Sequence, residues 1–258
     1  HPDLRQAMNP KIVDWSGKRV WLVGASSGIG AALAGELARR GARVALSARS
    51  VDKLRALAID GALLLPCDAT DTASLAGARK TLLAAWRGVD LVIYLAGDYV
   101  PMRAGDFDLA VAEKLVTVNF NAAMRLAATV LPDLQAGGGI AFVASVAGYR
   151  GLPKALAYGP GKAALIHFAE CLHLDLAPRG IGVWVINPGF VATQLTARND
   201  FAMPALLTPG EAALATVDGL KTGKFEIHYP KRFTRVMKLL ALLPYGLYFP
   251  VVRRLTGN

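Results

Sequence analysis

The sequence predicts a doubly wound α/β domain, in which a mostly parallel sheet is covered by helices on both faces. Short apolar runs alternate with longer segments of helical periodicity, as they do in repeated β-α-β units. Most of the apolar runs are continuous rather than alternating, which is expected of parallel strands that are buried on both faces. The length of 258 residues suits one such domain and is too short for two.

The expected elements follow from these patterns. The strands are predicted at residues 19–24, 43–48, 62–66, 89–96, 140–145, 182–187 and 225–228. The helices are predicted at residues 29–40, 51–58, 71–86, 108–136, 157–177 and 209–220. Gly41 and Gly180 stand where helix C-caps are needed. We expect an N-terminal arm at 1–15, a main domain at 16–230 and a basic, apolar and helical C-terminal extension at 231–258.

A glycine-rich turn follows the first expected strand and opens directly into a helix. Glycine allows the tight turn and lets the backbone approach a ligand closely. The helix N-terminus adds free N–H groups and the positive end of a dipole, which together bind phosphate. This strand–turn–helix context predicts a dinucleotide-binding domain of the Rossmann type. The expected phosphate contacts are Gly24, Ser26, Ser27, Gly28, Ile29 and Gly30.

The end of the second expected strand bears on the choice of cofactor. An NAD-selective site usually has a carboxylate here for the ribose 2′-hydroxyl, whereas this chain has Ala48 and then Arg49. A guanidinium suits a 2′-phosphate, so the sequence favours NADP(H) and leaves NAD(H) open. Asp68 and Ala69, after the third strand, are expected near the adenine, although a helix-capping role explains Asp68 almost equally well.

A tyrosine and a lysine form the core of the candidate catalytic group. Tyr158 and Lys162 are four residues apart in a helical pattern, so both lie on one face. With the positive charge of oxidised nicotinamide, the ammonium is expected to lower the phenol pKa from its usual value of about 10. Such a phenol can donate a proton to a carbonyl oxygen or accept one from an alcohol. Ser145 ends the fifth expected strand, and Asn119 lies in the long helix after the fourth.

These motifs in their order closely resemble the short-chain dehydrogenase/reductase family over about residues 16–230. The chain departs from the family pattern at Val23, where Thr is frequent, and at Leu95, where Asn is usual. Neither departure removes a catalytic group. The resemblance rests on Gly24, Gly28, Gly30, Asp68, Ala96, Gly97, Asn119, Ser145, Tyr158, Lys162, Pro188, Gly189, Val191 and Thr193.

The resemblance implies a role for each catalytic candidate. Tyr158 is the general acid/base, and Lys162 bonds the nicotinamide ribose and tunes the tyrosine. Ser145 polarises the substrate oxygen, and Asn119 holds a water in the proton relay. The implied contacts to the nicotinamide half of the cofactor are Ala96, Gly97, Tyr158, Lys162, Pro188, Gly189, Val191 and Thr193.

Substrate contacts in this family come from two segments, here 146–155 and 194–207. Their side chains are mostly apolar, which favours a lipophilic ketone or secondary alcohol, although the same residues could simply pack a mobile lid. With Ser145 and Tyr158, we expect Tyr149 and Leu152 to contact the substrate. The other apolar candidates are Leu195, Phe201, Met203 and Leu206. Two other functions stay open: a 3-oxoacyl-[acyl carrier protein] reductase and a cofactor-sensing binding protein without turnover.

The positive charge of the chain is concentrated at its C-terminal end. From residue 221 onward there are eight bases and one acid, so this part holds +7 of the net charge of +10. The bases alternate with leucines and aromatics, and no nucleic-acid recognition motif appears, so nucleic acid is not an expected partner. Pro244 and Pro250 are expected to break the extension into pieces too short to span a bilayer.

Two roles for the extension stay open. It either dips into an anionic lipid surface or covers a subunit interface or the active site. Similar tails occur in membrane-associated members such as the 11β-hydroxysteroid dehydrogenase group. By the same family resemblance we expect a homodimer or homotetramer, paired through the helices at 108–136 and 157–177.

The remaining features predict an ordinary cytoplasmic enzyme, with contact to a membrane surface as the alternative. Residues 1–15 are polar and lack the apolar core of a secretory signal. Cys67 and Cys171 both lie in apolar segments without metal-ligand spacing, so we expect two reduced thiols in or near the core and no metal.

Overall fold

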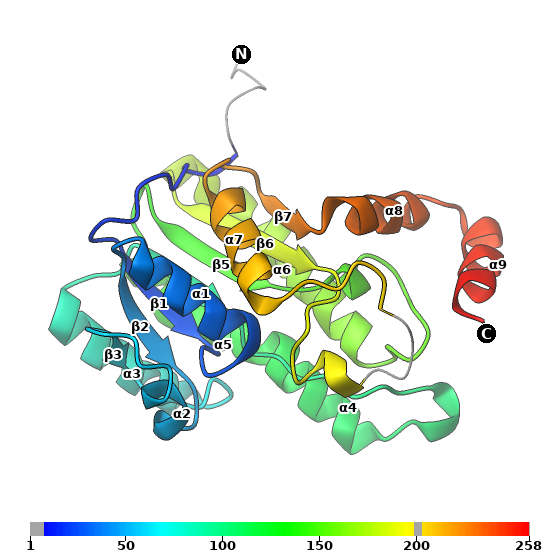
Figure 1. The fold of residues 1–258 in the computed structure, drawn as a ribbon, viewed down its shortest axis with the longest axis horizontal. Helices are drawn as coiled ribbons and strands as arrows, with labels where there is room; N and C mark the ends of the chain where they lie inside the picture. The colour runs from blue at the N-terminus through cyan, green and yellow to red at the C-terminus, as the bar shows by residue number, and fades with distance from the viewer. Residues whose placement is uncertain (1–7, 199–202, 258) are drawn as a thin grey trace, which may run out of the picture.

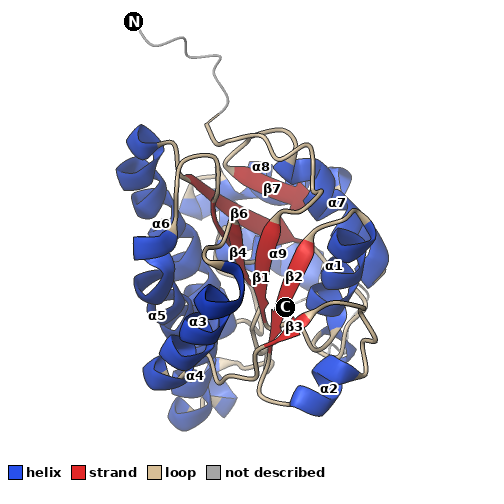
Figure 2. Ribbon diagram, turned by 90° about the vertical axis from the view of Figure 1, so that its left-hand side faces the viewer, coloured by secondary structure: helices blue, strands red, loops and turns tan. Residues whose placement is uncertain are grey.

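The computed structural model describes residues 8–198 and 203–257, and the predicted doubly wound α/β fold is confirmed. One seven-stranded sheet has the order β3-β2-β1-β4-β5-β6-β7, with every pair parallel. Helices cover both faces, with α3 to α6 on one side and α1, α2 and α7 on the other (Figures 1 and 2).

The elements lie close to the predicted positions. The strands are β1 Arg19–Val23, β2 Arg43–Ser47, β3 Leu63–Leu64, β4 Leu91–Tyr94, β5 Gly139–Val143, β6 Gly182–Pro188 and β7 Glu226–Tyr229. The helices are α1 Gly28–Arg39, α2 Val51–Arg55, α3 Thr72–Trp86, α4 Leu109–Val116, α5 Ala122–Val130, α6 Tyr158–Leu176, α7 Pro209–Leu220, α8 Lys231–Ala241 and α9 Tyr245–Thr256.

Alternate residues of each strand contribute to two separate cores. Trp21 packs with α3, α5 and α6 on one face, whereas its neighbour Leu22 packs with α1 and α7 on the other. Trp21 is fully buried, and its indole N–H donates to the Ser47 hydroxyl at 2.8 Å. Burial of both faces explains why the strands are continuously apolar in sequence.

The long helix predicted at 108–136 is interrupted. A π-helical turn, Thr117–Asn121, separates α4 from α5, and a 3₁₀ turn follows at Leu131–Asp133. The Asn119 side chain donates to the carbonyl of Leu115 at 2.9 Å, and Tyr94 donates to the carbonyl of Val118 at 2.5 Å. Side chains that bond these carbonyls widen the regular backbone ladder, which is a common cause of such bulges.

Three residues of the expected N-terminal arm, Asn9, Ile12 and Trp15, pack into the main domain. Ile12 and Trp15 are buried in the core. The Asn9 amide accepts from the N–H of Val183 at 3.0 Å and donates to its carbonyl at 2.7 Å. Because β7 pairs with β6 only from Val185 onward, the Asn9 side chain takes the place of a neighbouring strand at Val183.

The C-terminal extension forms two helices that project from the body of the domain (Figure 1). Pro244 precedes α9 as expected, but Pro250 lies inside this helix and does not break it. Proline there removes a single hydrogen bond, to the carbonyl of Gly246, and this exposed residue can bond water instead. Within the described residues, no helix is long and apolar enough to cross a membrane.

The two cysteines differ in environment. Cys67 is buried as predicted, whereas Cys171 is exposed on α6, because it faces away from the sheet. Both are free thiols.

Asn9→Ala should lower the free energy of unfolding by about 2 kcal/mol, because it leaves a buried backbone N–H and C=O of Val183 without partners. Urea denaturation followed by circular dichroism measures this loss. Met8→Ala is the matched control, since Met8 is the adjacent residue and is 64% exposed. Overlapping curves for the two variants would contradict the assignment.

Candidate active site

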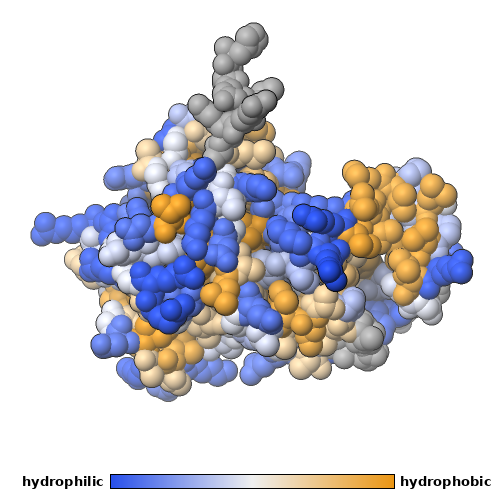
Figure 3. Space-filling model, turned by 45° about the horizontal axis from the view of Figure 1, so that its top comes forward, coloured by the Kyte–Doolittle hydropathy of each residue, from blue (hydrophilic) through white to orange (hydrophobic). Residues whose placement is uncertain are grey.

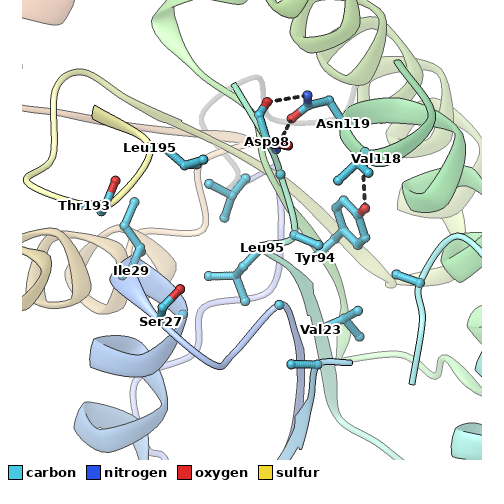
Figure 4. Close-up of a pocket in the computed structure, with 18 of the residues that line it drawn as sticks. Val23, Ser27, Ile29, Tyr94, Leu95, Asp98, Val118, Asn119, Thr193 and Leu195 are labelled. Atoms are coloured by element: carbon cyan, nitrogen blue, oxygen red, sulfur yellow. Dashed lines mark hydrogen bonds between the residues drawn. The ribbon is translucent and has the colours of Figure 1, made fainter. Parts of the chain in front are cut away.

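A cleft of about 930 Å³ lies at the carboxyl ends of β1, β2, β4, β5 and β6. Figure 4 shows part of it, with Ser27 and Ile29 on one side and Asn119 on the other. The structure brings into this cleft every residue that the sequence analysis named as catalytic or cofactor-binding. These are Gly24, Ser26, Ser27, Gly28, Ile29, Gly30, Arg49, Asp68, Ala69, Ala96, Gly97, Asn119, Ser145, Tyr158, Lys162, Pro188, Gly189, Val191 and Thr193.

The glycine turn allows close backbone packing at the start of α1. Gly24 has φ +97°, and a Cβ there would lie 2.3 Å from the backbone nitrogen of Ala96. A Cβ on Gly30 would lie 2.3 Å from the carbonyl oxygen of Gly24. Ser27 precedes α1 without a side-chain cap, and the first turn contains no acid. The N–H groups of this turn therefore remain available to an anion, and the cradle fits the pyrophosphate of a dinucleotide.

The rim of the cleft beyond β2 is basic. Arg49 is exposed there, and within the described part of the chain no carboxylate forms an ion pair with it. Lys53, in the first turn of α2, lines the same end, and the sequence analysis missed it. Two cations line this end of the cleft, and Ala48 rather than an acid follows β2, which fits a ribose 2′-phosphate.

Asp68 lies at the same end but is held by its own loop. Its carboxylate accepts from the Thr70 N–H at 2.8 Å and from the Thr70 hydroxyl at 2.7 Å. These hydrogen bonds, assisted by the charge of Arg49, lower the pKa of Asp68 despite partial burial. Asp68 therefore shapes the loop as an ionised side chain.

Tyr158 and Lys162 lie at the inner end of the cleft. Tyr158 is the first residue of α6, and the Lys162 Nζ atom lies one turn later, 5.6 Å from the centre of the phenol ring. The same Nζ atom donates to the carbonyl oxygen of Val143, at the end of β5, at 3.0 Å. This hydrogen bond fastens the start of α6 to the sheet and orients the amine towards the cleft.

Burial dominates the pKa values of this pair. It lowers the pKa of Lys162 to about 7, so near neutral pH the amine is divided between its charged and neutral forms. Burial also raises the pKa of Tyr158 to about 12, against a hydrogen bond from Ser145 that lowers it. The protein by itself therefore holds the phenol pKa above its usual value, because burial outweighs the hydrogen bond from Ser145. A further positive charge beside the ring would favour the phenolate.

Ser145 and Asn119 complete the group. The Ser145 hydroxyl caps the 3₁₀ turn Val146–Gly148 by accepting from the Ala147 N–H at 3.1 Å. Asn119 is fully buried and donates to the carbonyl of Leu115 at 2.9 Å. It also donates to the carbonyl of Asp98 at 2.8 Å (Figure 4). Its amide thus ties the π-helical turn to the segment that follows β4.

Gly97 has little room for a side chain at this point. A Cβ there would lie 3.0 Å from the Asn119 Oδ1 atom and 3.4 Å from the Lys162 Nζ atom. Glycine at this position therefore lets the backbone after β4 pass directly beside both groups.

The sequence analysis missed contacts beside Tyr158. The ring of Tyr99 packs edge-on against Tyr158, with ring centres 5.1 Å apart. Arg198 bonds the Asp98 carboxylate at 2.8 Å and the carbonyl of Tyr99, which links the segment after β4 to the segment after β6. No local pattern signals the two bonds of Arg198, because they join residues 99 and 100 positions apart.

Two predicted substrate residues do not line the cleft. The Tyr149 hydroxyl turns away and donates to the Glu226 carboxylate on β7, and Leu152 is likewise not among the lining residues. Leu195 does line the cleft, as predicted. Met203 and Leu206 line a second, adjoining hollow of about 530 Å³, and Phe201 lies outside the described residues.

Comparisons with known proteins agree with this geometry. The family model for short chain dehydrogenases matches residues 18–202. An oxidoreductase from Myxococcus xanthus (strain DK1622) is 32% identical over 252 residues, covering 95% of this chain and 100% of that protein.

Two solved structures share the fold. A dehydrogenase/reductase from Sinorhizobium meliloti 1021 superposes with a TM-score of 0.75 at 25% identity, covering 86% of this chain and 95% of that chain. A short chain dehydrogenase from Burkholderia cenocepacia J2315, in complex with NADP, has a TM-score of 0.75 at 26% identity, covering 83% of this chain and 96% of that chain. The chain therefore belongs to the short-chain dehydrogenase/reductase family, whose members are NAD(P)-dependent oxidoreductases that act on CH–OH groups.

Proposed function

We propose that this enzyme uses NADP(H) to interconvert a ketone and a secondary alcohol on a lipophilic substrate. One observation carries the proposal: a phenol, a hydroxyl and a buried amine meet at one end of a cleft whose other end has a phosphate cradle and a basic rim. When bound, the nicotinamide supplies or accepts the hydride at the substrate carbon. The protein must then handle the proton and the substrate oxygen.

Tyr158 and Ser145 would perform these tasks. In reduction, Tyr158 donates its hydroxyl proton to the carbonyl oxygen, and in oxidation it accepts the proton of the alcohol. The Ser145 hydroxyl donates a hydrogen bond to the same oxygen and offsets its developing negative charge. Lys162, held by the carbonyl of Val143, favours the phenolate when it is charged. Each role uses a group at the observed inner end of the cleft.

A preference for NADP(H) is supported by the basic rim at Arg49 and Lys53. Two donors there can bond a 2′-phosphate, and the structural relative from Burkholderia cenocepacia was solved with NADP. A lipophilic substrate is supported by Leu195 in the cleft and by Met203 and Leu206 in the adjoining hollow.

We also propose that the outer face of α8 and α9 contacts an anionic lipid surface. Its exposed apolar side chains gather beside basic ones (Figure 3), and residues 227–258 contain six Lys and Arg residues but no acid. Members of the family typically form oligomers, and we expect pairing through α5 and α6, where Leu174 is exposed. The exposed apolar residues of α8, α9 and the turn between them are Val236, Leu239, Leu242, Tyr245, Leu247, Phe249 and Leu255.

Tyr158→Phe should lower kcat at least about a hundredfold, because the proton donor is lost while the ring is kept. The assay is NADPH oxidation with the best substrate from a panel of steroids, long-chain ketones and 3-oxoacyl thioesters. The Kd for NADPH should stay close to that of the wild type, which shows that the variant folds. Retained turnover would overturn the acid/base role. Turnover confined to carrier-protein thioesters would favour the 3-oxoacyl reductase alternative.

Arg49→Ala should raise the KM for NADPH about tenfold or more, because charge-assisted hydrogen bonds to the 2′-phosphate are lost. The KM for NADH should change little, since NADH lacks that phosphate. Arg55→Ala is the matched control, because Arg55 ends the nearby helix α2, pairs with Asp52 and does not line the cleft. Equal losses for both cofactors would contradict the assignment.

A Leu239→Glu/Leu242→Glu double variant should lose binding to phosphatidylglycerol vesicles, because it places two carboxylates on the apolar face. Co-sedimentation with these vesicles, and with uncharged phosphatidylcholine vesicles, measures the effect. Val13→Glu, at a similarly exposed apolar side chain far from α8, should bind like the wild type. If the wild type binds neither vesicle and the double variant instead dissociates by light scattering, the face is a subunit interface.

A further inference from the structure

The segment 146–157 joins two of the groups proposed to act on the substrate, since Ser145 precedes it and Tyr158 follows it. Its second half is fixed to the chain after β4. The Met102 N–H donates to the carbonyl of Lys154 at 3.0 Å, and the Leu156 N–H donates to the carbonyl of Met102 at 3.4 Å. Its first half is held from the opposite direction, by the C-terminal helices.

Arg150 is the main link between this segment and α8. Its guanidinium donates to the carbonyl of Ala241 at 3.0 Å and also to the carbonyl of Leu243. Ala241 is the last residue of α8 and Leu243 lies two residues beyond it, at the end where a helix leaves its last acceptors unpaired and its dipole is negative. A positively charged, planar donor fork suits this position.

The same guanidinium contacts α9. Its central carbon lies 4.6 Å from the ring centre of Tyr245 and 4.0 Å from that of Tyr248. Tyr248 is buried, and its hydroxyl donates to the carbonyl of Gly151 at 2.7 Å. Residues 150 and 151 are therefore bonded to both helices.

A second link runs through Glu226 on β7. One carboxylate oxygen accepts from the Tyr149 hydroxyl and, at 2.8 Å, from the Asn187 amide, and the other accepts from the Lys238 amine on α8. Burial raises the pKa of Glu226, but these three hydrogen bonds outweigh it and the pKa is lowered. The ionised carboxylate thus joins β7 to the segment after Ser145, the end of β6 and α8.

We propose that α8 and α9 form a clamp that positions segment 146–157, which joins Ser145 to Tyr158 without itself lining the cleft, and that Arg150 is the positioning residue on which this clamp depends. The inference rests on the proposed function, because it is the ketone-binding end of the cleft that the clamp holds in shape. The extension then acts on substrate binding through its inner face, while its outer face stays exposed. Arg150 acts through the segment and touches neither the substrate oxygen nor the cofactor.

Arg150→Ala should raise the KM for the ketone about tenfold, while kcat and the Kd for NADPH stay close to the wild-type values, because the segment loses its hold and the catalytic groups remain. Arg150→Lys keeps the charge but not the planar fork, so its KM for the ketone should lie between those of the wild type and Arg150→Ala. Arg235→Ala removes an exposed arginine of α8 that has no hydrogen bond to the segment, and it should behave as the wild type. An unchanged KM in Arg150→Ala would overturn the proposal.

Tyr248→Phe removes the hydrogen bond from the Tyr248 hydroxyl to the carbonyl of Gly151 and keeps the aromatic ring. It should raise the KM in the same sense but less, and the effect of Arg150→Ala should be non-additive with it, since both act on one segment.

Amide hydrogen exchange gives a readout that needs no turnover. Exchange over residues 149–153 should become faster in Arg150→Ala and not in Arg235→Ala. If no ketone is turned over by the wild type, the proposed function fails while this measurement still decides on the clamp. Unchanged exchange in Arg150→Ala, or faster exchange throughout its domain, would overturn the clamp proposal.

Discussion

The active site depends on a single constraint, the parallel register of neighbouring strands. Val23 pairs with Tyr94, Tyr94 pairs with Phe142, and Val143 pairs with Ile186, so β1, β4, β5 and β6 end at nearly one level. The residues that follow each strand are therefore delivered to one edge of the sheet. Without this alignment, the glycine turn, the Ser145 hydroxyl and the segment after Pro188 would not share a cleft.

The features that the sequence predicted well are those encoded locally. Continuous apolar runs identified the strands, and the glycine turn, the Tyr158–Lys162 spacing and the position of Ser145 identified the members of the cleft. Each of these signals lies within one element or at its end, where side-chain period and backbone freedom are enough to predict the outcome. The pKa of the phenol in the protein alone was not predictable, because burial is the main cause of its shift and the sequence does not show how deeply the ring is buried.

The features that the sequence did not predict come from contacts between distant segments. Asn9 bonds Val183 across 174 positions, and Arg150 reaches the end of α8 across 91. Tyr149 looked like a substrate contact because of its apolar neighbours, but the carboxylate of Glu226 offers its hydroxyl a partner on the other side. In each case a buried or partly buried polar group takes the partner that satisfies it, and only the folded chain shows which one.

The absence of any acid from residues 227–258 has a consequence for how the C-terminal helices respond to their surroundings. The six Lys and Arg side chains of this stretch therefore produce a field of one sign, which no acidic side chain within residues 227–258 offsets. The distance over which this field acts depends on the salt concentration, since the Debye length shrinks from about 30 Å at 0.01 M to about 10 Å at 0.1 M. Ionic strength is thus the natural control over any long-range attraction that this end of the molecule exerts.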